Sequence, residues 1–148
     1  MLKNIEAIKH LTANQKKELE EYANGLVESM EGAGLGKEEI KEKCEIMVEY
    51  QANLLAAERL RGQHNSFLKK VEHYAALYKN EADDEKAQEY LSKVNEFNKK
   101  IEMASKKYDI FEKKRSDLES AAVQTNEYIN KLTKTKEKQP QNRTTVKK

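Results

Sequence analysis

The sequence of 148 residues has no tryptophan, one proline, one cysteine and five glycines. Glycine and proline weaken or break helices, so their scarcity favours long helices, and a thin helical core has no deep pocket for tryptophan. The single cysteine, Cys44, has no second cysteine with which to form a disulfide or share a metal site. We therefore expect Cys44 to be a small apolar residue within a helix.

The sequence also lacks any long apolar run. No segment approaches the roughly 18 apolar residues of a transmembrane helix, and the first residues lack the apolar core of a secretory signal. Hydrophobic residues make up 37% of the chain and charged residues 36%, a balance typical of a helix-rich protein with little interior. These features predict a cytoplasmic protein that does not bind membranes.

What the sequence does contain is a regular heptad pattern from Ala87 to Leu132. Apolar or aromatic residues recur there at alternating steps of three and four, and only Arg115 and Thr125 depart from the pattern. Residues spaced about 3.5 apart stay on one side of a slightly underwound helix. The pattern predicts one helix over about residues 84–133, roughly 75 Å long, that packs against another helix.

A second heptad pattern runs from Ile46 to Tyr78 and predicts a helix over about residues 37–79. Its two polar members are Asn53 and His64. A polar residue in such a pattern fixes the register of helix pairing, and a histidine there can make assembly depend on pH. Asn53 and His64 are therefore candidates for a register-setting or pH-sensitive role.

The connection between the two long helices, at residues 80–84, is very short. It forces the helices to fold back on each other as an antiparallel coiled-coil hairpin. Residue i of one helix then faces roughly residue 163 minus i of the other. This register places Phe67 beside Phe97 and Tyr50 near Lys113.

A shorter helix is predicted over about residues 13–31. Thr12 and Gln15 have the spacing of a capping box, and the apolar residues that follow have helical spacing. Three glycines within residues 32–36 favour a turn that brings the next helix back antiparallel. The predicted fold class is therefore all-α: an elongated coiled-coil hairpin with a third, shorter N-terminal helix packed at its open end.

The predicted helices form a single domain over residues 1–133, which leaves residues 134–148 as a tail. Residues 131–148 hold seven Lys or Arg residues and one Glu, a local charge of +6, although the whole chain carries only +2. Such a segment is too polar to bury, so we expect a disordered basic tail.

Four apolar residues near the hairpin tip are candidates for a protein-binding surface. The first helix is too short to cover them, and contiguous exposed apolar surface marks an interface. Self-association through this surface is the leading hypothesis, and docking on another protein is the rival. The third alternative is that these residues are simply exposed to water and bind nothing. The candidate residues are Leu68, Ala75, Leu77 and Leu91.

Five lysines recur one heptad apart along one edge of the last helix and span roughly 42 Å. Such a row has the charge and length to follow a nucleic-acid backbone or an acidic partner. Lysines also commonly flank helix seams, no aromatic residues stand among these lysines to stack bases, and no DNA-binding motif is present. The polyanion-binding candidates are Lys86, Lys93, Lys100, Lys107 and Lys114.

Patterns for catalysis, metal binding and cofactor binding are absent from the sequence. The three histidines have no histidine four residues on and no glutamate three residues before, and the glycine-rich turn lacks the lysine of a phosphate-binding loop. We therefore predict no enzymatic activity, cofactor, metal or small-molecule substrate, and no motif matches a known family. The predicted function is that of a self-associating, non-enzymatic adaptor or inhibitor that binds another protein, with a nucleic-acid-associated accessory protein as the alternative.

Overall fold

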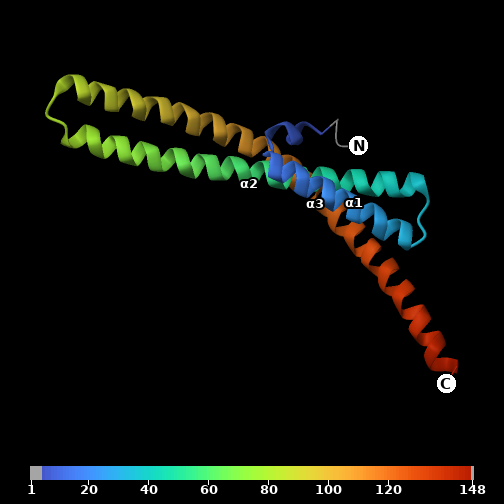
Figure 1. Ribbon diagram of the computed structural model, residues 1–148. Coiled ribbons are helices and arrows are strands. Elements are labelled where there is room, and N and C mark those ends of the chain that lie inside the picture. Colours follow the sequence, from blue (N-terminus) through green and yellow to red (C-terminus); the bar gives the residue numbers. More distant parts are fainter. Residues whose placement is uncertain (1–4, 148) are drawn as a thin grey trace. The chain divides into compact units, whose positions relative to one another are not determined.

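A computed structural model describes the backbone of residues 5–147 and the side chains of residues 5–134. The described residues form a 3-10 helix, η2 (Glu6–His10), and three α-helices, α1 (Ala13–Gly32), α2 (Lys37–Asn80) and α3 (Asp84–Lys147). The long helices α2 and α3 pack against each other as a helical hairpin, and α1 is the shorter third helix (Figure 1). The predicted all-α class and hairpin arrangement are confirmed.

The start of α1 is fixed by the capping box that the sequence predicts. The backbone N–H of Gln15 donates to the Thr12 hydroxyl at 3.1 Å, and the backbone N–H of Thr12 donates to the Gln15 side-chain oxygen at 3.0 Å. Both bonds satisfy N–H groups that have no partner within the first helical turn. The Gln15 side-chain nitrogen also donates to the Leu55 carbonyl at 3.3 Å, which ties the start of α1 to α2.

Replacing Thr12 with alanine is expected to lower the free energy of unfolding by about 1 kcal/mol, because the Gln15 N–H loses its acceptor. Urea denaturation followed by circular dichroism measures the loss. The control is Asn14→Ala, at an exposed position in the first turn of α1, which should change stability by less than about 0.5 kcal/mol. Equal losses in the two variants would contradict a stabilising role for the capping box.

The turn between α1 and α2 ends the first helix with a Schellman motif. Gly34 has a φ of +88°, the left-handed conformation predicted for this glycine-rich segment. The Leu35 N–H donates to the Met30 carbonyl at 3.1 Å, and the Gly34 N–H donates to the Glu31 carbonyl at 3.0 Å. Leu35 also packs against the buried cluster that contains Met30. The same turn therefore satisfies the last carbonyls of α1 and covers part of the core.

The turn between α2 and α3 is short, and a polar side chain within it begins the next helix. The Asp83 carboxylate accepts a hydrogen bond from the Glu85 backbone N–H at 3.1 Å, which makes Asp83 the N-cap of α3. Acidic residues in the first turn of α3 interact favourably with the positive end of the helix dipole. The register set by this turn places the Phe67 and Phe97 rings 6.0 Å apart, as predicted.

The chain is divided into two compact units, each built from parts of α2 and α3. One unit comprises residues 56–112 and includes the turn between these helices. Aromatic side chains pack across the hairpin there: Tyr74 lies 5.9 Å from Phe97 and 6.3 Å from Tyr90, measured between ring centroids. The buried residues of this unit include Ala56, Ala57, Leu60, Ala104 and Phe111. These residues lie away from the turn, whereas residues nearer the turn, such as Phe67 and Tyr74, are only partly buried.

The other unit comprises residues 1–55 and 113–148 and contains α1. Its core includes a cluster that draws on three helices, with Met30 from α1, Ile40 and Cys44 from α2, and Ile129 from α3. Met30 and Cys44 are 0% exposed. The interpretation of Cys44 as a small apolar helix residue agrees with this position.

The two polar residues in the heptad pattern of α3 both have hydrogen-bond partners. The Arg115 guanidinium donates to the Tyr50 hydroxyl at 3.3 Å, and the Thr125 hydroxyl donates to the Ala121 carbonyl at 2.7 Å. The predicted register places Tyr50 near Lys113. Its hydrogen-bond partner, Arg115, lies two residues further along α3.

The far end of α3 differs from the expected one. The helix continues to Lys147, beyond the predicted end near residue 133. Lysine, glutamate and glutamine, which have high helix propensity, make up half of residues 134–147. The stretch also contains Pro140, which has no backbone N–H to donate within the helix. The side chains of residues 135–148 lie outside the described residues. The disordered basic tail over 134–148 and the single domain over 1–133 therefore stay predictions.

Candidate functional site

The four apolar candidates lie in the unit formed by residues 56–112, but they do not share one surface. Leu68 is 42% exposed and Ala75 is exposed, whereas Leu77 and Leu91 are half-buried. Leu68 and Ala75 are seven residues apart, about two helical turns, and so lie on the same side of α2. Leu77 is nine residues from Leu68, about half a turn out of phase, and lies on the opposite side of α2. The structure therefore separates Leu77 from Leu68 and Ala75.

Leu91 of α3 lies on the same edge of the hairpin as Leu68 and Ala75. Arg61 of α2 and Ser105 of α3 line one groove between the two helices. Leu68 and Ala75 follow Arg61 by seven and fourteen residues, and Leu91 precedes Ser105 by fourteen. Steps of seven residues return to nearly the same side of a helix. We call Leu68, Ala75 and Leu91 the apolar edge.

The groove beyond the apolar edge has a volume of about 340 Å³ and is lined by side chains that each carry a polar group. Its lining residues are Arg61, His64, Asn65, Ser105, Tyr108 and Asp109. His64, predicted as a polar member of the heptad pattern, is half-buried beside this groove. The same edge of the hairpin is therefore apolar near the turn and polar further along both helices.

Asn53, the other polar member of the pattern in α2, is 1% exposed. Its side-chain nitrogen donates to the Glu49 carbonyl at 2.7 Å. Its side-chain oxygen is buried and has no hydrogen-bond partner. A buried acceptor without a partner lowers the stability of the fold, and the register-setting role of Asn53 stays a prediction.

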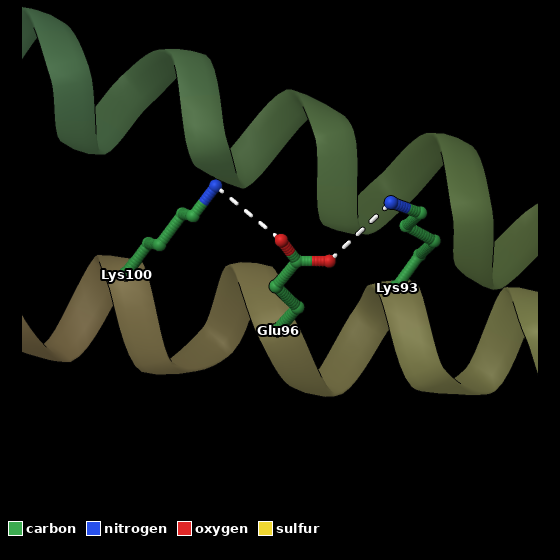
Figure 2. Close-up of polar contacts among 3 residues, drawn as sticks. All are labelled: Lys93, Glu96 and Lys100. Atoms are coloured by element: carbon green, nitrogen blue, oxygen red, sulfur yellow. Dashed lines mark hydrogen bonds and ion pairs between the residues drawn. The ribbon is translucent and has the colours of Figure 1, made fainter.

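The five lysines of the predicted row are all exposed on α3, and two of them share one carboxylate. Lys93 pairs with Glu96 at 3.4 Å and Lys100 pairs with Glu96 at 3.5 Å (Figure 2). The positive charge of Lys93, followed by that of Lys100, lowers the pKa of the Glu96 carboxyl below its ordinary value. The Lys100 ammonium also lies 4.9 Å from the centroid of the Phe97 ring. Glu96 therefore offsets part of the charge that the row would present to a polyanion.

Met103 and Ile110 form an exposed apolar pair that the heptad pattern does not identify. Their side chains are 59% and 54% exposed. Neither residue belongs to the heptad pattern from Ala87 to Leu132, so that pattern does not predict them. The available signal is a repeat of Lys-Lys, any residue, an acidic residue and an apolar residue, at 99–103 and again at 106–110. We call Met103 and Ile110, with Lys99, Lys100, Lys106 and Lys107, the basic-apolar strip.

Two other kinds of site are not found in the described part of the chain. No group of three or more His, Cys, Asp or Glu side chains among residues 5–134 is placed to hold a metal ion. Within the described residues, no helix combines the length and apolar character needed to cross a membrane. Comparison of the chain with protein-family models, with curated proteins and with solved structures finds no match.

Proposed function

We propose that this protein acts without catalysis, as an adaptor or inhibitor that binds other protein surfaces, and that it self-associates through the apolar edge. The observation that carries the proposal is the 42% exposure of Leu68, a large apolar side chain on a helix whose buried face is already occupied. Ala75 and Leu91 extend the apolar surface on the same edge. Covering such a surface is favourable by roughly 25 cal/mol per Å² of apolar area removed from water.

A second copy of the chain fits this edge because a two-fold contact places the same residues on both sides. The apolar edge of one copy then covers that of the other without a separate complementary surface. The contact is apolar, so salt screens it little. We expect self-association to persist at high ionic strength.

The state of Cys44 supports a role without thiol chemistry. Its side chain is 0% exposed within the core cluster of α1, α2 and α3. Burial raises the pKa of the Cys44 thiol above its ordinary value, which disfavours the reactive thiolate.

Replacing Ala75 with glutamate is expected to convert the self-associated protein to a monomer, because the new carboxylate would be buried in the contact. The matched control is Ala76→Glu. Ala76 is exposed like Ala75 but lies about 100° further round α2, away from the apolar edge. Sedimentation equilibrium over a range of concentrations measures the dissociation constant, and we expect at least about a tenfold weakening for Ala75→Glu alone.

Two results would contradict self-association through this edge. One is a wild-type protein that stays monomeric at the highest concentration tested. The other is an equal effect of Ala75→Glu and Ala76→Glu, which would place the contact elsewhere or attribute it to net charge.

A further inference from the structure

The surroundings of Met103 differ from those of an ordinary exposed residue on a charged helix. Residues three and four positions away are the nearest neighbours on a helix surface. For Met103 these are Lys99 and Lys100 on one side and Lys106 and Lys107 on the other. All four neighbours are therefore lysines, and Lys106 and Lys107 are in turn the preceding neighbours of Ile110.

We infer that the basic-apolar strip is a docking site for an acidic amphipathic helix of another protein. Such a helix presents apolar side chains at the seven-residue spacing of Met103 and Ile110, roughly 10 Å, with carboxylates on both sides of them. The inference rests on the proposed protein-binding role and does not depend on self-association through the apolar edge.

The lysines of the strip are available to a partner. Lys100 pairs with Glu96 at 3.5 Å, and Lys106 pairs with Glu102 at 3.4 Å with both side chains more than two-thirds exposed. Exposed pairs of this kind contribute little, typically less than about 1 kcal/mol, because water and salt screen them. A partner carboxylate can therefore replace Glu96 or Glu102 at small cost.

The apolar pair distinguishes an acidic helix from a nucleic acid. A phosphate backbone would contact the lysines, but it offers no apolar group to cover Met103 and Ile110. Met103 has a flexible side chain that adapts to different apolar partners, which suits a protein groove or helix. The surface of α3 at Met103 is also slightly hollowed. Lys99 and Lys100 line this hollow, which reaches Glu96 and, at its far end, Leu91 of the apolar edge.

The same charges disfavour a second copy of this chain on the strip. A two-fold contact would bring the four lysines of one copy against those of the other, and like charges facing each other repel. Among the described residues, Glu96 and Glu102 each pair with only one lysine of the strip, so a partner that brings several carboxylates complements the strip better than a second copy of it.

The test is a binding titration by fluorescence anisotropy with the full chain and three probes. The first is a synthetic peptide about three heptads long, with leucines at seven-residue spacing flanked by glutamates. The second has the same composition in scrambled order, and the third is a DNA duplex of about 20 base pairs. We expect the patterned peptide to bind at least about tenfold more tightly than the scrambled one.

The double variant Met103→Gln with Ile110→Gln separates the apolar contribution from the charge. We expect it to remove the preference for the patterned peptide and to leave binding of the scrambled peptide unchanged. Val123→Gln is the matched control, since Val123 is an apolar residue of α3 with 50% exposure and no place in the strip. Lys99→Gln with Lys107→Gln should weaken both peptides, because both carry the same negative charge.

Three outcomes would overturn the inference. They are equal affinity for the patterned and scrambled peptides, an unchanged preference in the Met103 and Ile110 variant, and tighter binding of the DNA duplex than of the patterned peptide. Repeating the titration with the Leu68→Glu variant keeps the two proposals distinct. Loss of self-association with retained peptide binding would support both proposals. Self-association that survives Leu68→Glu would contradict the apolar edge, and loss of peptide binding in this variant would show that the strip is not a separate site.

Discussion

Replacing Met30 with alanine is expected to lower the free energy of unfolding by about 3 kcal/mol. Met30 is 0% exposed and packs in a cluster with Ile40, Cys44 and Ile129. The truncated side chain leaves a cavity among three helices, and the fixed α1–α2 turn limits how far α1 can move to fill it. The loss therefore combines the transfer energy of the removed atoms with the energy of the cavity.

Met103→Ala is a control that makes the same change of side chain at an exposed position. Met103 is 59% exposed, so its truncation should change stability by less than about 0.5 kcal/mol. Urea denaturation followed by circular dichroism gives both values. Similar losses in the two variants would contradict the placement of Met30 in the core.

Replacing Asn53 with leucine is expected to raise the free energy of unfolding by about 1–2 kcal/mol. The side chains have similar shape, and leucine removes the buried oxygen that has no hydrogen-bond partner. The bond from the Asn53 side chain to the Glu49 carbonyl is also lost, but that carbonyl still accepts a bond within the helix. Lower stability in Asn53→Leu would show that an ordered water or a rearranged partner satisfies the oxygen.

Replacing Asn53 with aspartate should instead lower the free energy of unfolding, by about 3 kcal/mol at neutral pH. The reason is that the variant buries a charge at a position that is only 1% exposed. Burial would raise the folded-state pKa of the introduced carboxyl group above its unfolded value. The loss is then full above the folded-state pKa and disappears as the pH falls below the unfolded-state pKa. Urea titrations at pH values of about 7 and 4 measure this recovery, and a loss that is independent of pH would contradict it.

The helices were predictable because the signals that begin and end them are local. The Thr12 capping box, the glycines of the α1–α2 turn and the short connection before Asp84 each act within a few residues. The pairing of Phe67 with Phe97 then follows from the position of the turn alone. The partner of Tyr50, Arg115, lies two residues beyond the predicted Lys113, because side chains as long as those of tyrosine and arginine can contact each other across a shift of this size.

The candidate surfaces were only partly predictable. Leu68, Ala75 and Leu91 follow from the apolar residues beside the seam, but Leu77 was grouped with them by its distance along the chain rather than by its angle around the helix. Met103 and Ile110 lie outside the heptad pattern, and the exposure of a side chain cannot be predicted from its hydrophobicity alone. The absence of a partner for the Asn53 oxygen depends on side-chain geometry, which no sequence pattern encodes.

Burial protects Cys44 from chemical modification. It is the single thiol of the chain, and at 0% exposure a solvent-borne reagent cannot reach it while the surrounding helices stay packed. Reaction therefore requires a transient local opening around α1 and the first part of α2, and its rate depends on how often such openings occur. The molecule thus carries a natural, single-site reporter of its own breathing motions, placed in the unit that contains α1.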